Sequence, residues 1–536
     1  MKKKLLPALI VTGLIILVVI IMGITALINK YTPTKKTEDL KEYFNISSDD
    51  EAALIVDNEL SDYKAKIIDK KIYVDYKFVH DSLNSRFYWD ANENVLLYTT
   101  ASDIISAAAD SNSYSVTKQT NDFGYPIVKA TSDSALIALD YVKQYSNITF
   151  KSYDDPARIV ITSKWDEIDS ATVSKSTQVR VKGGIKSPIL KEVKKDDKIT
   201  ILDSGDKWDK VATEDGVIGY IKSKALCESK KTKLTNPDYE EETFTHIKKD
   251  KDICLAWNQV TSQSANSKVP QVISSTKGIN VMSPTWFYLN DNNGNLADIA
   301  SKDYVSYCHS QGIEVWGLFS NFENTDVDAA YVLTHTSTRT TLINQIMSAA
   351  FNYELDGVNI DFENITEAAY GDSYIEFIRE LAIKCHNNGI SLSVDVTVPA
   401  SFNKFFNRSD MANFADYIVI MGYDEHYKGS DAGSVSSIPW VTEGVESTLK
   451  EVPADQIILG MPFYTRIWEL TPKEDDDAVT DTEDQSKYTV ASQVYSMDAA
   501  AAQLATNNAT AALDEESGQN YAEWSVSNKL YKVWLE

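Results

Sequence analysis

Residues 356–365 read DGVNIDFENI, and this stretch decides the fold that we predict for the second half of the chain. Side chains alternate between the two faces of a strand, so Asn359, Asp361 and Glu363 share one face and three apolar residues share the other. The apolar face can pack against helices, whereas carboxylates are rarely buried without a partner or a role. The polar face is therefore a candidate site, although the same acids could bind calcium or simply cap the strand.

Strand and helix patterns alternate around this stretch. Apolar runs bounded by turn residues predict eight strands, at residues 253–260, 279–289, 313–320, 357–363, 390–398, 417–423, 457–464 and 531–535. Amphipathic stretches at 337–353 and 369–387 predict helices between them. This α/β order predicts a (β/α)8 TIM barrel over residues 251–536, with its active site at the C-terminal ends of the strands.

Five motifs connect this barrel to a known family. DGVNIDFE resembles the DGxDxDxE signature of glycoside hydrolase family 18, which includes chitinases and N-acetylglucosaminidases. MGYDEH (421–426), IPW (438–440), GMPFYTRIW (460–468) and VWLE (533–536) resemble that family's sixth, seventh and eighth strands in order. The resemblance covers roughly the last half of the chain, and it is closest to the cell-wall and spore-cortex branch of bacteria.

The resemblance implies three catalytic residues. Glu363 matches the general acid that protonates the leaving oxygen. The nucleophile is then the substrate's own 2-acetamido oxygen, held in place as an intramolecular reactant. Asp361 would hold the acetamido N–H and raise the Glu363 pKa by like-charge repulsion, and Tyr423 would bond the acetamido oxygen.

The same resemblance implies a set of substrate-binding residues. Met421 and Asp424 match neighbours that line the subsite, and Trp534 matches the aromatic floor beneath the sugar ring. Tyr464 and Arg466, in the seventh-strand motif, are candidates for the substrate-binding rim. Met421 and Trp534, each taken alone, are also compatible with ordinary barrel core.

Asn359 departs from the family pattern, because many chitinases have an aspartate at this place. An asparagine can hydrogen-bond Asp361 but cannot share a titrating proton with it. We therefore expect Asp361 to remain more consistently ionised than in a chitinase. Asn359 is included among the substrate-binding candidates.

No cofactor or metal is required by this chemistry. The four cysteines, at positions 227, 254, 308 and 385, show neither metal-ligand spacing nor a disulfide framework. Cys308 and Cys385 lie at predicted helix ends and are expected to be packing residues. His309 and His386 follow them, near the barrel rim opposite the chemistry, and are not expected to be catalytic.

Charge and the N-terminus indicate the location. The formal net charge of -26 disfavours nucleic acid as a partner, because phosphate binding needs clustered cations. Lys2, Lys3 and Lys4 precede an uncharged apolar run over residues 5–27, long enough to cross a bilayer. We predict that residues 1–30 form a single-pass membrane anchor with the lysines cytoplasmic and the rest of the chain outside. A cleaved signal peptide, followed by secretion, is the alternative.

The segments before the barrel are predicted as two small domains. Residues 31–50 are polar and indicate a tether. Residues 51–165 alternate short strands around a helix, an α+β pattern that resembles the copper amine oxidase N-terminal-like domain of bacterial wall proteins. No copper follows from that name, because the stretch lacks a histidine cluster.

Residues 170–229 predict a small all-β domain, because short strands alternate there with GG, DD, SGD and EDG turns. This pattern resembles a bacterial SH3-like barrel. Trp208 and Tyr220 could line a groove that binds wall peptides, or they could be core residues of a spacer. Residues 230–250 are charged and indicate a linker.

The chain ends directly after the eighth predicted strand, so we expect the barrel to lack its last helix. The leading hypothesis for function is a membrane-anchored extracytoplasmic glycosidase that cleaves β-1,4 bonds beside N-acetylglucosamine in peptidoglycan. A chitinase or an endo-N-acetylglucosaminidase is the enzymatic alternative. A non-catalytic, lectin-like barrel is the alternative from another class, and the presence of Glu363 weighs against it.

Overall fold

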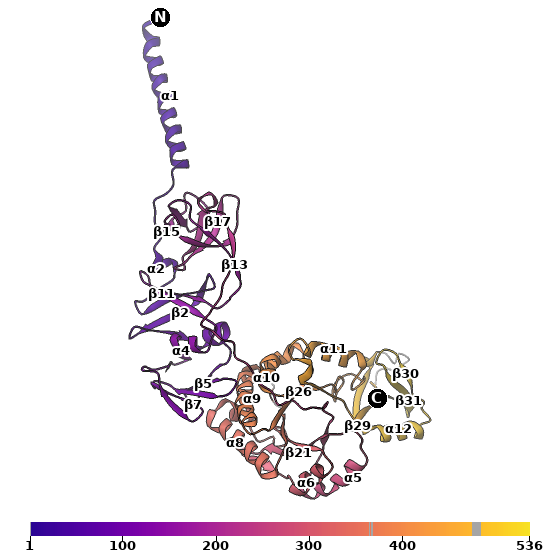
Figure 1. The fold of residues 1–536 in the computed structure, drawn as a ribbon. Coiled ribbons are helices and arrows are strands. Elements are labelled where there is room, and N and C mark those ends of the chain that lie inside the picture. Colours follow the sequence, from indigo (N-terminus) through magenta and orange to yellow (C-terminus); the bar gives the residue numbers. More distant parts are fainter. Residues whose placement is uncertain (1, 364, 366–367, 474–483, 536) are drawn as a thin grey trace. The chain divides into compact units, whose positions relative to one another are not determined.

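The computed structural model describes residues 2–363, 365, 368–473 and 484–535. The chain divides into two compact units (Figure 1). The first contains residues 1–89, 107–114 and 120–241, and the second contains residues 90–106, 115–119 and 242–536.

The first unit begins with the apolar helix α1 (Lys2–Tyr31). Its stretch Leu9–Tyr31 is long and apolar enough to cross a membrane, and its side chains are exposed. An exposed helix of this composition is typical of a membrane anchor or a signal sequence.

Two sheets build the rest of the first unit. The first sheet runs in the order β11 (Thr149–Tyr153), β12 (Arg158–Thr162), β1 (Glu51–Val56), β2 (Glu59–Ile68), β3 (Lys71–Asp75), β10 (Ala135–Ala138), β9 (Val128–Ala130). Two helices accompany it, α3 (Tyr76–Phe78) and α4 (Leu139–Gln144). The second sheet runs in the order β15 (Ile189–Val193), β14 (Thr177–Arg180), β18 (Ile218–Lys222), β17 (Trp208–Thr213), β16 (Lys198–Asp203), β13 (Glu167–Thr172), β19 (Lys230–Lys233).

The segment expected to be a tether, residues 31–50, is partly packed. It contains the helix α2 (Leu40–Tyr43), and the following Phe44 is fully buried in a cluster with Ala53, Ile55 and residues of the second sheet. The hydroxyl of Tyr43 donates to the carbonyl of Ile218 at 2.7 Å. The backbone N–H groups of Thr34 and Glu38 also donate to the carbonyls of Ile185 and Ile189, so several contacts hold this polar stretch to the fold.

Seven of the eight predicted barrel strands form one parallel sheet in the second unit. In order they are β20 (Leu255–Asn258), β21 (Val281–Leu289), β23 (Glu314–Ser320), β24 (Gly357–Asp361), β25 (Ser391–Thr397), β26 (Tyr417–Met421) and β27 (Ile457–Gly460). A short strand, β22 (Leu296–Asp298), pairs antiparallel with β21. This parallel order, with helices between the strands, is consistent with a TIM barrel.

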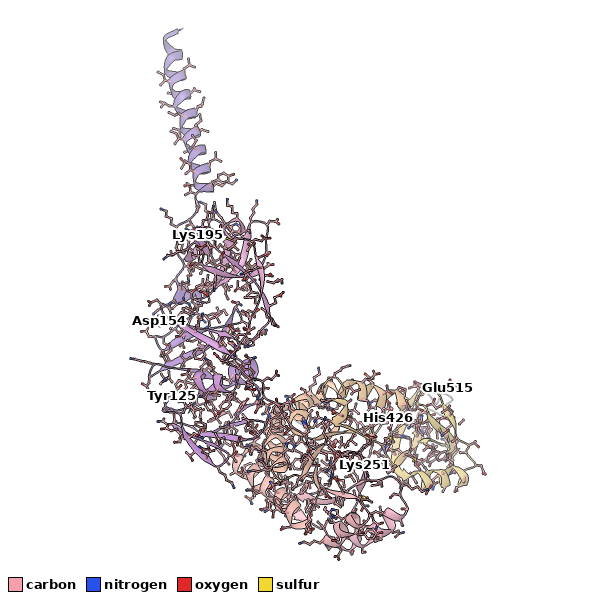
Figure 2. All side chains as sticks on the ribbon, viewed as in Figure 1. Tyr125, Asp154, Lys195, Lys251, His426 and Glu515 are labelled. Carbon is pink, nitrogen blue, oxygen red and sulfur yellow. The ribbon has the colours of Figure 1, made fainter. Side chains whose placement is uncertain are left out.

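Helices cover the outside of these strands (Figure 1). They are α5 (Val269–Ser274), α6 (Lys302–Ser310), α7 (Ala329–Thr334), α8 (Thr336–Tyr353), α9 (Gly371–His386), α10 (Arg408–Phe414) and α11 (Ile438–Thr448). Figure 2 shows side chains filling the space between strands and helices. One large apolar cluster joins most of these strands to α5, α6, α7, α8, α9 and α10, and its close packing fixes their arrangement.

The eighth predicted strand is not a barrel strand. Residues 531–535 belong to β32 (Lys529–Leu535), which pairs antiparallel with β28 (Tyr464–Pro472) and β31 (Gln519–Val526). Ser527 and Asn528, the two residues between β31 and β32, both have positive φ. Such a two-residue turn makes a hairpin and forces antiparallel pairing, whereas a parallel barrel strand needs a long crossover.

The C-terminal sheet is therefore a separate layer after β27. Its order is β29 (Tyr488–Ser496), β28, β32, β31, β30 (Ala512–Asp514), and the helix α12 (Met497–Thr506) packs on it. The acidic stretch after the seventh predicted strand, residues 473–487, predicts a solvated loop that leads into an inserted subdomain, and this sheet occupies the place of that subdomain. Most of the acidic loop expected to lead into it, residues 474–483, lies outside the described residues.

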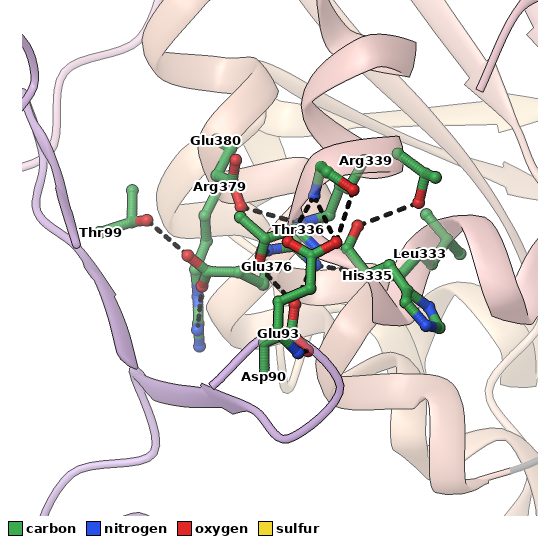
Figure 3. Close-up of polar contacts among 12 residues, drawn as sticks. Asp90, Glu93, Thr99, Leu333, His335, Thr336, Arg339, Glu376, Arg379 and Glu380 are labelled. Carbon is green, nitrogen blue, oxygen red and sulfur yellow. Dashed lines mark hydrogen bonds and ion pairs between the residues drawn. The ribbon is translucent and has the colours of Figure 1, made fainter. Parts of the chain in front are cut away.

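Five short strands lie between β3 and β9: β4 (Phe87–Asp90), β5 (Val95–Thr99), β6 (Ile104–Ala108), β7 (Ser113–Val116) and β8 (Gln119–Asp122). Residues 90–106 of this stretch group with the barrel, where Asp90 and Glu93 accept hydrogen bonds from the first backbone N–H groups of α8 (Figure 3). The residue before α8, His335, makes no side-chain cap. Two carboxylates from a distant segment therefore satisfy this helix end.

Beside that contact lies a buried ion cluster, also drawn in Figure 3. Arg339 Nε donates to Glu380 at 2.8 Å, and Arg379 Nη1 donates to Glu376 at 3.0 Å. Thr99 Oγ1 donates to the second oxygen of Glu376 at 2.7 Å. Buried charges are tolerated when they are paired and hydrogen-bonded, so Thr99 completes the cluster.

Candidate active site

The strand β24 carries the candidate acids, and a neighbouring strand on each side holds it in place. It pairs in parallel with β23 and β25. Gly357 opens the strand against the ring of Trp316, where an added Cβ would lie 2.6 Å from the ring carbons. Val358 and Ile360 are fully buried in the core, so the alternate side chains face the inside of the barrel.

Asn359 is the centre of a buried hydrogen-bond network. Its Oδ1 accepts from Trp257 Nε1 and from Ser283 Oγ, each at 3.0 Å. Its Nδ2 donates to Ser393 Oγ at 3.0 Å and to Asp395 Oδ1 at 2.7 Å. All four hydrogen-bonding positions of the amide are thereby used, which fixes its orientation.

This network differs from the expectation for Asn359. The amide donates to Asp395 on the neighbouring strand, and Oδ1 of Asp361 is buried without a hydrogen-bond partner among the described residues. Burial, followed by the charges of Glu363 and Glu323, raises the pKa of Asp361 to about 8. Asp361 is therefore largely protonated at neutral pH, not more consistently ionised as the sequence suggested.

Glu363 lies just beyond the end of β24 and is exposed. Desolvation raises its pKa, and the charges of Asp424 and Glu323 raise it further. Ser320 Oγ holds Glu323 in place with a hydrogen bond of 2.6 Å. The raised pKa of Glu363 agrees with the expected direction, although Asp424 and Glu323 are the neighbouring charges that produce it. A carboxyl group that keeps its proton near neutral pH can act as a general acid.

A second group of predicted residues lies around the end of β26. Tyr423 is packed edge-on against Trp257 and Tyr464, with ring centroids 6.2 Å apart in each pair. Tyr464 Oη donates to Asp424 Oδ1 at 2.8 Å, and Arg466 Nη2 donates to the same oxygen at 3.3 Å. The tyrosine and the arginine thus fix the aspartate whose charge acts on the acid.

Burial, followed by the charge of Asp395, raises the pKa of Tyr423 above its ordinary value. The phenol therefore stays a hydrogen-bond donor at any physiological pH. Burial, followed by its hydrogen bond to Asp424, raises the pKa of Tyr464 in the same way.

Met421 and Trp534 differ in their relation to this site. Met421 is 8% exposed at the end of β26, opposite Gly460 of β27. Trp534 lies in β32, where its ring packs against Tyr521 and its Nε1 donates to Asp514 at 3.4 Å. The contacts of the described residues do not join Trp534 to the carboxylates of β24.

The sequence analysis did not predict three residues of the site. Trp257 in β20 and Asp395 in β25 are hydrogen-bonded to Asn359, and Glu323, beyond the end of β23, raises the pKa of Glu363. The alternation rule applied to DGVNIDFE would also have found Asp395 in SLSVDVTV, since it lies on the inward-facing side of β25. Trp257 packs on Gly460, where an added Cβ would lie 2.8 Å from its ring.

Comparison with known sequences finds a family that is similar to the second half of the chain. Residues 303–534 match the family described as Glycosyl hydrolases family 18. This segment is thus similar to the glycosyl hydrolases of family 18. The match includes β24 with Asn359, Asp361 and Glu363, and it ends in β32.

Three curated relatives are similar to parts of this chain. The "Uncharacterized glycosylase YvbX" of Bacillus subtilis (strain 168) is 25% identical over 194 residues, 34% of this chain and 55% of that relative. The "Cortical fragment-lytic enzyme" of the same organism is 23% identical over 254 residues, 46% of this chain and 56% of that protein. The "Cortical fragment-lytic enzyme" of Bacillus anthracis is 26% identical over 166 residues, 29% of this chain and 38% of that protein. The chain thus spans about half or less of the length of these relatives.

Proposed function

We propose that this protein is a membrane-anchored, extracytoplasmic glycosidase that cleaves β-1,4 bonds beside N-acetylglucosamine in peptidoglycan, with retention through the substrate's acetamido group. The observation that carries the proposal is the pair Asp361 and Glu363 at the C-terminal end of β24. Asp361 is half-buried, with a buried Oδ1 and a pKa of about 8, and Glu363 is exposed with a raised pKa. Two acids in such different environments are typical of glycosidase sites.

In the proposed reaction Glu363 is the general acid. Its exposed position lets it reach a leaving glycosidic oxygen, and its raised pKa favours the protonated form that a general acid needs. As the acetamido oxygen attacks the anomeric carbon, positive charge develops on the acetamido nitrogen. Asp361 accepts the N–H there and offsets that charge once it is ionised.

Tyr423 positions the acetamido group from the other side. Its ring is held between Trp257 and Tyr464, so its hydroxyl is a pre-oriented donor to the acetamido oxygen. Asp424, Tyr464 and Met421 complete the lining of this subsite in the proposal. Trp534 remains a proposed floor for the sugar ring.

Exposed aromatic side chains at the same end of the barrel favour a polymeric substrate. Phe322, Phe402, Tyr427 and Phe463 follow β23, β25, β26 and β27, and between 38% and 85% of each is exposed. Parallel strands place their C-terminal ends at one edge, so these rings surround the same mouth. Flat aromatic faces suit pyranose rings, and an array of them suits a chain of sugars.

Two observations outside the barrel support an extracytoplasmic location and the cell wall as the substrate. The exposed apolar helix α1 fits an anchor that leaves the catalytic domain outside the membrane. Two relatives carry the name cortical fragment-lytic enzyme, and spore cortex is peptidoglycan. In the proposal, the second sheet of the first unit is an SH3-like domain that contacts wall peptides.

The proposal is tested by the release of new reducing ends from peptidoglycan and, separately, from chitin oligomers. The full chain in detergent micelles is compared with Glu363→Gln and with Glu446→Gln, an exposed glutamate on the outer helix α11. We expect cleavage of peptidoglycan that Glu363→Gln lowers by 10²–10⁴-fold and that Glu446→Gln leaves unchanged.

Cleavage of chitin oligomers alone would make the protein a chitinase. Equal glycan binding by the wild type and Glu363→Gln, with no cleavage of either polymer, would make the barrel a lectin-like module and refute the proposal.

A further inference from the structure

Asp395 is a buried carboxyl group that the proposed reaction leaves without a role. It lies on β25 and is 3% exposed. Its Oδ1 accepts the 2.7 Å hydrogen bond from Asn359, and its Oδ2 is buried without a partner among the described residues. A buried carboxylate oxygen with no donor is costly, so this oxygen needs either a proton or a partner.

The register of the sheet places Asp395 next to Asp361. Asn359 lies opposite Ser393, and the next pair along the strands is Ile360 opposite Val394. One further step brings Asp361 opposite Asp395, both on the inward face. Neighbouring strands are about 4.8 Å apart, so two such carboxyl groups are within reach of one shared proton. Asp361 Oδ1 is likewise buried and unpartnered in the described part of the chain.

The groups around Asp395 favour a shared proton. Asp361 and Glu363 face it from β24, Tyr374 faces it from α9 and Tyr423 faces it from beyond β26. None of these is a cation. Burial, followed by the charge of Asp361, raises the pKa of Asp395 well above its ordinary value. Two like charges at this separation cannot both form, so the pair titrates as a unit.

We propose that Asp395 is a positioning residue that shares one proton with Asp361 and takes that proton when Asp361 must become negative. This inference rests on the proposed function. The O–H bond on Asp361 breaks, an O–H bond forms on Asp395 Oδ2, and the reverse transfer follows product release. Glu363 keeps its own proton for the leaving oxygen, so the total number of protons does not change during the transfer.

Asn359 determines which oxygen of Asp395 is left to take the shared proton. Its amide donates to Asp395 Oδ1 and cannot ionise, so the free oxygen of Asp395 is Oδ2. The carboxylate that the family signature places at position 359 is thus supplied from the adjacent strand.

The test compares the pH dependence of kcat and KM for the full chain, Asp395→Asn and the exchange variant Asn359→Asp with Asp395→Asn. We expect Asp395→Asn to lower kcat at least tenfold with little change in KM, and to move the acidic limb of kcat to higher pH. The acidic limb of kcat moves to higher pH because Asp361 must then lose its proton to solvent. The exchange variant restores a carboxylate beside Asp361 and returns the limb toward its original position.

A purely structural role gives a different result. If Asp395→Asn lowers kcat equally at every pH and the exchange variant restores nothing, the proposal is overturned. Circular dichroism of each variant checks that the isosteric replacement leaves the fold intact.

A readout independent of activity separates this inference from the proposed function. Infrared difference spectra during a pH titration follow the protonated carboxyl groups in the wild type, Asp395→Asn, Asp361→Asn and the exposed control Asp303→Asn. Sharing predicts that removing either member of the pair shifts the titration of the other, and that Asp303→Asn shifts neither. A protein that cleaves neither polymer refutes the proposed function, while an Asp361 titration unchanged in Asp395→Asn refutes the proton sharing.

Discussion

Replacing Asp90 by asparagine is expected to destabilise the barrel, although Asp90 lies more than 240 residues before the helix that it caps. Asp90 Oδ2 accepts from the backbone N–H of Thr336 at 2.7 Å and from its hydroxyl at 2.6 Å. Oδ1 accepts from the backbone N–H groups of Asn92 and Glu93, at 2.9 and 3.0 Å. The side chain is 1% exposed, so water cannot replace these bonds.

The magnitude follows from which bonds the asparagine loses. Its oxygen keeps the two bonds within the turn, but its NH₂ group then faces the N–H of Thr336 and cannot accept from it. A hydrogen bond to a charged group contributes about 1.5–3 kcal/mol. The interaction of a negative charge with a helix N-terminus contributes about 0.3–1 kcal/mol more. The hydroxyl of Thr336 can turn and accept from the new amide, so we expect a net loss of about 2 kcal/mol.

The assay is thermal unfolding of the full chain followed by tryptophan fluorescence, since Trp257, Trp286 and Trp316 lie in the barrel. A loss of about 2 kcal/mol lowers the Tm of a unit of this size by about 3 °C. Asp110→Asn is the control, because that side chain is 68% exposed. A barrel transition that Asp90→Asn moves no more than Asp110→Asn does would refute the reasoning.

Three further predictions concern the site. Gly460→Ala should push the ring of Trp257 away from its place, because the new Cβ would lie 2.8 Å from it; we expect kcat to fall more than KM rises, measured by reducing-end release. Asp424→Asn removes a negative charge that raises the pKa of Glu363, so Glu363 should lose its proton earlier and the basic limb of kcat/KM should move to lower pH. Phe463→Ala removes a ring that is 85% exposed at the mouth of the barrel, so KM for long glycans should rise several-fold while kcat on short oligomers stays the same.

The barrel strands were predictable because a local rule governs them. Seven of the eight predicted segments are parallel strands, and their observed bounds lie inside or within a few residues of the predicted ones. The eighth failed because its apolar alternation, YKVWL, suits any strand that is buried on one face. Its sheet was decided by the turn at Ser527 and Asn528, whose positive φ values are not visible in a hydrophobic pattern.

The candidate site was predicted in part for the same reason. Alternation along β24 put Asn359, Asp361 and Glu363 on one face, whereas the motifs gave no sign that Asp424 acts on the pKa of Glu363. What Asn359 binds was not predictable, because its partner Asp395 is 36 residues away along the chain. The protonation of Asp361 was not predictable either, since burial is its largest cause and burial depends on the whole barrel.

The sequence by itself determined the parallel barrel strands, the apolar N-terminal helix and the acids at the end of β24, because side-chain periodicity and apolar length act through neighbouring residues. Only the tertiary structure decided which groups meet: Asn359 with Asp395, and Asp90 with the first turn of α8. Hydrogen bonds and desolvation depend on distances in space, and residues far apart in the chain are brought within those distances only when the strands and helices pack into one core.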